Sequence, residues 1–246
     1  MEVEFTATAR RFGIFSAAAT VILLVAYAAT LIVGLASLES PDQPIGEPMI
    51  TMLEILIIGM MPAMVALMVA VHAWAPMRAK TLSLTSLIFM GLLAGVTCSL
   101  HFMILTLSRQ PEFGGRPWHP LVFSFEWPSV AYALDIMGWD VFFALSMLFA
   151  APVFSGSRLA AWIRWLIIAR GVLSLAGLSG VAVGDMQVRN IGIVGYVGVF
   201  LVVAVLLAVF FYRAKPKREA VGGQGSFGTS RSSIHSSAQE GNSQGL

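Results

Sequence analysis

Charged residues are scarce in this sequence. They make up 11% of its 246 residues, against roughly a quarter of an ordinary soluble domain, whereas apolar residues reach 57%. A soluble fold of this length could not hide that much apolar surface behind so few charges. The composition therefore excludes a soluble globular domain and indicates a polytopic membrane protein.

Cysteine and the common catalytic motifs are also nearly absent. Cys98 is the only cysteine, so no disulfide can form within the chain. The sequence has no Walker A motif, no dinucleotide-binding fingerprint, no HExxH and no CxxC, and we find no internal repeat. We expect no metal site and no nucleic-acid partner, and no cofactor is indicated.

Six apolar stretches are long enough to cross a bilayer, whose core of ~30 Å needs about 20 helical residues. They cover residues 12–36, 49–73, 81–107, 129–154, 159–184 and 191–212. The sequence therefore predicts an all-α integral membrane protein, with a bundle of six transmembrane helices within residues 1–213. The lipid bilayer is its first expected partner.

Arginine and lysine are distributed unevenly between the two sides. Eleven of the 15 lie at the termini, in the loop between spans 2 and 3, or near the loop between spans 4 and 5. Three lie in the opposite loops, among them Arg189, and Arg170 lies within a span. The bias predicts a multi-pass protein of the cell (inner or plasma) membrane with both termini in the cytoplasm.

The last part of the chain, residues 214–246, has a different composition. It begins with the basic cluster of "RAKPKRE", which should attract anionic lipid by ~1 kcal/mol per basic residue. From Ala220 onward Gly, Ser and Gln dominate. We expect a basic and then disordered cytoplasmic tail.

Three ionisable residues on three different spans fall at one depth. Glu54, His101 and Asp135 each lie about five or six residues below the predicted outer ends of their helices, roughly 8–10 Å at 1.5 Å per residue. Charges in lipid are costly, so such groups usually face the protein interior. Tyr132 and Trp139 share the helix face of Asp135. These five residues are the candidate ligand-binding site, and a hydrogen-bonded tie between helices without a ligand is the alternative.

Asp140 and Arg170 are expected to form a separate, structural ion pair. An ideal helix turns Asp140 about 140° away from Asp135, so a single neighbour should not serve both carboxylates. Arg170 reaches a similar depth from the next span, and a guanidinium can hold a carboxylate through two hydrogen bonds. The other interpretation is that Arg170 faces a cavity and binds an anion.

Small residues recur on spans 5 and 6, at Ala176, Gly180 and Gly184 and again at Gly192, Gly195 and Gly198. Such residues let helix backbones approach closely in lipid. The pattern predicts close packing of span 5 on span 6, or a homo-oligomer formed through these helices.

The stretch "ALDIMGWDVFFALSMLFAAPVF" in span 4 resembles segments of small uncharacterised bacterial multi-span inner-membrane proteins. That family has no assigned activity, so the resemblance implies the membrane class and no mechanism.

Three function classes follow. The first is a small-molecule or ion transporter, or a ligand sensor, that uses the polar outer pocket, with Pro62 as a hinge in span 2. The second is a structural or assembly subunit that packs through helices 5 and 6. The third is an intramembrane metal-dependent enzyme acting at His101. We favour the first, and enzymatic activity is not expected.

Overall fold

The computed structural model describes residues 5–40, 43, 45–189 and 191–215, and these form helices without a strand. In chain order the elements are α1 (Ala7–Ala36), α2 (Met49–Trp74), η1 (Met77–Ala79), α3 (Lys80–Thr106), α4 (His119–Phe123), α5 (Val130–Ile136), η2 (Met137–Phe142), α6 (Phe143–Ala150), η3 (Ala151–Val153), α7 (Arg158–Val183), α8 (Met186–Arg189), α9 (Ile191–Ile193), η4 (Val194–Val199) and α10 (Phe200–Arg213). Two of them, η2 and η4, are π-helical turns.

Six segments of the described chain are long and apolar enough to cross a membrane. They are Ala7–Ala36, Met49–Trp74, Met77–Thr106, Val130–Val153, Arg158–Val183 and Met186–Arg213. The predicted all-α bundle of six membrane helices is thus confirmed. Below, span 4 denotes the segment built from α5, η2, α6 and η3, and span 6 the segment built from α8, α9, η4 and α10.

The first and last spans begin earlier than the sequence predicts. The first begins at Ala7 because the Thr6 hydroxyl accepts a hydrogen bond from the Ala9 amide (3.1 Å) and caps the helix there. The last begins at Met186, where we expected a loop. The short helix α8 therefore belongs to span 6.

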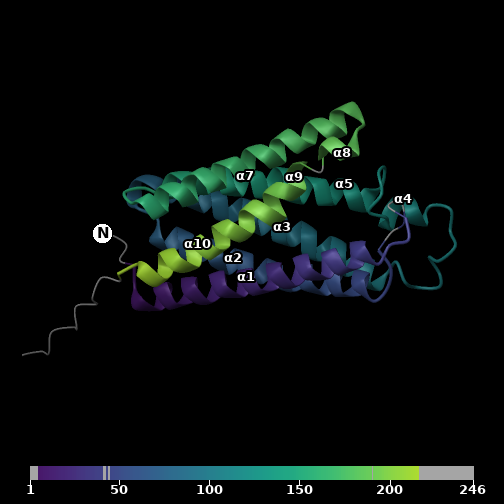
Figure 1. Cartoon of the computed structure of the whole chain (residues 1–246), viewed down its shortest axis with the longest axis horizontal. Coiled ribbons are helices and arrows are strands. Elements are labelled where there is room, and N and C mark those ends of the chain that lie inside the picture. Colours follow the sequence, from purple (N-terminus) through teal and green to yellow (C-terminus); the bar gives the residue numbers. More distant parts are fainter. Residues whose placement is uncertain (1–4, 41–42, 44, 190, 216–246) are drawn as a thin grey trace, which may run out of the picture.

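Both described ends of the chain lie at the same end of the bundle, here called the terminal end (Figure 1). Phe5 stacks on Phe211, with ring centroids 6.2 Å apart. The Arg10 guanidinium donates to the backbone carbonyls of Phe211 (3.2 Å) and Tyr212 (2.6 Å), the place where a cation stabilises a helix end. The tail predicted to be disordered lies, from residue 216 on, outside the described residues.

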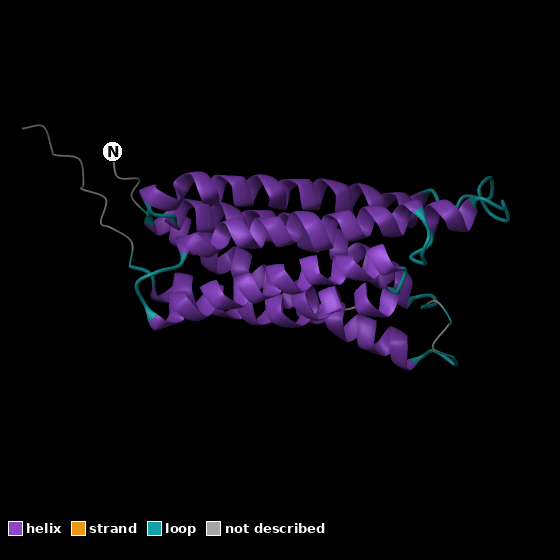
Figure 2. Ribbon diagram, turned by 90° about the horizontal axis from the view of Figure 1, so that it is seen from above, coloured by secondary structure: helices purple, strands orange, loops and turns teal. Residues whose placement is uncertain are grey.

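The opposite end, here called the distal end, carries the loops after α1, before α5 and after α7. Figure 2 shows the helices running along the long axis between these two ends. The core includes Met60, Met64, Phe143 and Phe200, which are at most 1% exposed. On the outer surface Phe15 is 74% exposed, as a residue facing lipid would be.

Serine hydroxyls link α3 to span 4 within this core. Ser86 donates to the backbone carbonyl of Ser146 (2.6 Å), and Ser146 donates to the carbonyl of Ser86 (2.9 Å). Reciprocal hydrogen bonds of this kind hold helices together where no hydrophobic driving force exists between them.

Glycines allow α7 and the start of span 6 to approach closely. A Cβ on Gly180 would lie 2.5 Å from the backbone nitrogen of Arg189, and one on Gly195 would lie 3.3 Å from the backbone carbonyl oxygen of Arg170. These glycines therefore serve packing within one chain. A homo-oligomer through the same helices stays a prediction.

Candidate functional site

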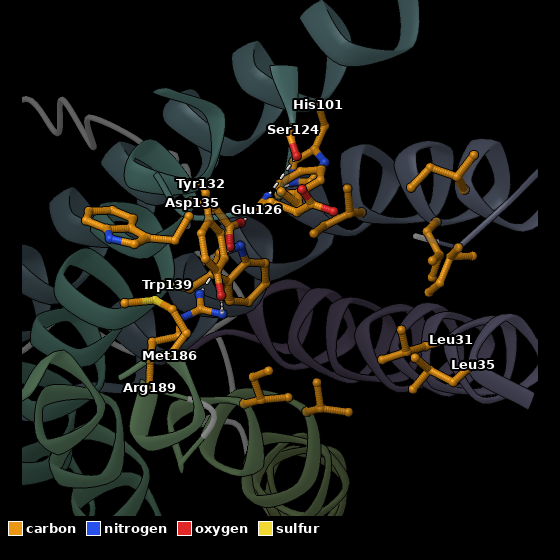
Figure 3. A pocket seen from close by; sticks show the side chains of 18 of the residues that line it. Leu31, Leu35, His101, Ser124, Glu126, Tyr132, Asp135, Trp139, Met186 and Arg189 are labelled. Carbon is orange, nitrogen blue, oxygen red and sulfur yellow. Dashed lines mark hydrogen bonds and ion pairs between the residues drawn. The ribbon is translucent and has the colours of Figure 1, made fainter. Parts of the chain in front are cut away.

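A cavity of about 1070 Å³ lies toward the distal end of the bundle. Its walls come from α1 and α2 on one side and from α3, α5, η2, α8 and η4 on the other (Figure 3). The loop before α5 and the start of α8 with the turn before it also line the cavity, through Ser124, Phe125, Glu126, Trp127, Asp185, Met186 and Gln187.

The structure brings Glu54, His101 and Asp135 together at this cavity, on α2, α3 and α5. His101 Nδ1 lies 2.7 Å from Glu54 Oε2, and both side chains are at least 94% buried. The His101 ring also stacks on Phe125, with centroids 5.4 Å apart, which fixes its plane.

The other imidazole nitrogen has no such partner. His101 Nε2 is buried, makes no hydrogen bond to any described residue, and lies 3.9 Å from Asp135 Oδ1. That distance is too long for a hydrogen bond. His101 and Asp135 therefore present one unpaired nitrogen and one carboxylate oxygen side by side at the cavity wall.

Arg189, on α8, holds both aspartates of span 4. Its Nη2 lies 3.2 Å from Asp135 Oδ2 and its Nε lies 3.2 Å from Asp140 Oδ2. Its Nη1 donates to the Tyr132 hydroxyl (3.3 Å), and its guanidinium carbon lies 4.9 Å from the centre of that ring. The arginine is 3% exposed and Asp140 is fully buried.

The expectation that a single neighbour could not serve both carboxylates is therefore wrong. The reason is the π-helical turn η2, which begins at Met137, between Asp135 and Asp140. A π turn uses more residues per revolution than an α turn. Each residue then rotates the chain through a smaller angle, so Asp140 comes to lie closer to the face of Asp135.

The predicted Asp140–Arg170 ion pair is corrected for the same reason, because Asp140 pairs with Arg189 instead. Arg170 is fully buried, and its guanidinium carbon lies 3.4 Å from the centre of the Phe143 ring. Its Nη2 donates to the backbone carbonyl of Trp139 (3.2 Å). A cation over a ring face is stabilised by the ring quadrupole, which a buried arginine can use in place of a carboxylate.

Tyr132 and Trp139 both line the cavity next to Asp135. Trp139 is 5% exposed and packs edge-on against Phe143, with centroids 5.5 Å apart. Tyr27 of α1 and Tyr196 of η4 line the same cavity and were not singled out from the sequence. Their positions on two other spans gave no signal, since a lone tyrosine in a span is ordinary.

Arg189 was assigned to a loop in the sequence analysis. That assignment is wrong, because α8 packs its backbone on α7 at Gly177 and Gly180 and so carries the side chain into the bundle. The signal that could have found it is the excess of carboxylates on span 4, which required a second buried cation.

The polar part of the described cavity lining is mostly acidic, and aromatic rings lie beside it. Its acidic side chains are Glu54, Asp135, Glu126 and Asp185, whereas it holds a single arginine, which is already paired. Acidic groups beside aromatic ring faces favour a positively charged occupant.

Among the described residues no three histidine, cysteine or acidic side chains are placed so that they could hold a metal ion. No protein-family model, no curated protein and no solved structure matches this chain.

Proposed function

We propose that this chain is a membrane protein that binds a small organic cation in its distal cavity, as a transporter or a ligand sensor. The observation that carries the proposal is Asp135. Its Oδ2 is paired with Arg189, while its Oδ1 faces the unpaired Nε2 of His101 at the cavity wall. An ammonium group at this position would gain a carboxylate oxygen within reach of aromatic ring faces.

The surrounding groups support this role for Asp135. Glu54 is occupied by His101 and Asp140 by Arg189. Asp135 is the most exposed of these three acids, with 14% of its side chain exposed against 2% for Glu54 and 0% for Asp140. The distribution of arginine and lysine supports a cell-membrane location with cytoplasmic termini, in which the cavity faces the outer side.

The test is the binding of benzyltrimethylammonium to the purified full-length chain in phosphatidylcholine nanodiscs, followed by calorimetry. Asp135→Asn should weaken binding about tenfold or more, since a charged partner contributes on the order of 1.5–3 kcal/mol. In this variant Arg189 still forms its ion pair with Asp140, so the fold should persist.

Glu112→Gln is the matched control, because Glu112 is an exposed acid of the distal loops outside the cavity lining. It should bind like the unmodified chain. Equal affinity of the Asp135→Asn variant, or no binding by the unmodified chain, would refute the proposal.

A further inference from the structure

The cavity is polar on one side and apolar on the other. The ionisable groups lie mainly on α3, α5 and α8, with Glu54 on α2, whereas α1 and α2 contribute a row of aliphatic side chains: Leu24, Leu31, Leu35, Leu53, Ile57 and Met60. Figure 3 shows Leu31 and Leu35 well separated from Asp135 and Arg189. An occupant that fills the whole cavity must therefore be polar at one end and apolar at the other.

One face of α1 changes from packed to cavity-lining along its length. In its first half Gly13 and Ala17 are buried, and a Cβ on Gly13 would lie 2.9 Å from the Phe211 ring of α10. Further along the same face, Leu31 and Leu35 line the cavity, and Leu35 is 54% exposed.

Span 6 changes in the same way. Its α10 part is packed through residues such as Val203 and Leu207, whereas Ile193, Tyr196 and Val197 line the cavity. In Figure 1, α10 lies against α1 at the terminal end and moves away from it toward α9. Leu31 of α1 and Tyr196 and Val197 of span 6 line the cavity beyond the point where the two helices diverge (Figure 1).

The size of the cavity sets the scale of the occupant. A volume of about 1070 Å³ is at the upper limit of the roughly 300–1,000 Å³ usual for small-molecule sites. A simple ammonium ion would leave the aliphatic wall without a contact. A molecule with a long hydrocarbon chain would cover it.

We propose that the occupant is a single-chain cationic amphiphile drawn from the bilayer. Its charged head lies beside Asp135 and His101, and its chain lies along the aliphatic side chains of α1 and α2. The inference rests on the proposed function, since it uses the same cation site, and it adds the chemical class of the ligand.

The test uses alkyltrimethylammonium ions from tetramethyl to dodecyl, bound to the full-length chain in phosphatidylcholine nanodiscs. Empty nanodiscs measure the partitioning to be subtracted. Affinity, referred to the free aqueous concentration, should rise about fourfold per methylene until the chain fills the apolar wall, and then level off.

Two neighbouring substitutions on α1 distinguish binding in the cavity from partitioning into the bilayer. Leu31→Gln should weaken dodecyltrimethylammonium binding about tenfold and leave tetramethylammonium binding unchanged, because it removes apolar contact with the chain alone. Ile32→Gln is the matched control: Ile32 is 66% exposed and lies outside the cavity lining. It should change neither affinity.

Photolabelling of the unmodified chain gives a readout that needs no variant. A diazirine at the end of the dodecyl chain should label peptides of α1 or α2. Asp135-dependent binding without a gain from chain length, or labelling confined to α3 and α5, would overturn the amphiphile and leave the cation site standing. Absence of Asp135-dependent binding across the series would overturn both.

Discussion

At the scale of single residues, Arg189 organises the site. Its guanidinium contacts two carboxylates and a tyrosine hydroxyl through three different nitrogens while 3% of the residue is exposed. Removing one partner of such a buried ion pair leaves an uncompensated charge, which costs more than the pair contributes.

Arg189→Gln should therefore lower the free energy of unfolding by about 3–5 kcal/mol, and Asp140→Asn added to it should restore part of that loss. The measurement is a denaturation titration in mixed micelles. Arg109→Gln is the control, since Arg109 forms an exposed ion pair with Glu47 (2.9 Å) and should cost at most about 1 kcal/mol. Strict additivity of the two single changes would show that Asp140 and Arg189 are not coupled.

At the scale of elements, the six spans could be predicted because length and hydropathy alone determine them. The depth of Glu54, His101 and Asp135 below the span ends also predicts that they share one level, and the structure brings these side chains together. The partner of Asp140 could not be predicted in this way. It depends on a π-helical turn that no residue pattern predicts. It also depends on the four-residue helix α8, which packs against Gly180.

Gly180→Ala tests whether α8 must pack closely against Gly180. The new Cβ would meet the backbone nitrogen of Arg189 and the carbonyl oxygen of Asp185, both at 2.5 Å, so α8 must shift. We expect a loss of about 1–3 kcal/mol in stability, together with weaker cation binding as Arg189 moves from Asp135. Gly198→Ala, whose Cβ would meet nothing within 4 Å, should change neither. Thermal unfolding and ligand calorimetry give the two readouts, and equal behaviour of both variants would contradict the packing argument.

At the scale of the whole molecule, the even number of spans agrees with the two described ends meeting at the terminal end. The charge distribution then predicts which side each end faces. Reporter fusions after Glu47 and after Glu112 should be active on the outer side, and a fusion after Lys80 on the cytoplasmic side. A cytoplasmic signal at Glu47 would reverse the orientation and place the cavity mouth on the inner side.

The separation of Arg189 from its aspartates along the chain has a consequence for biogenesis. Asp135 and Asp140 leave the ribosome 54 and 49 residues before the guanidinium that pairs with them. During that interval span 4 holds two carboxylates that are costly to expose to lipid. We predict that span 4 is unstable in the bilayer as an independent helix and that it inserts together with the hairpin of α7 and span 6. Residues 130–213, which cover spans 4 to 6, would then form a single unit of membrane insertion.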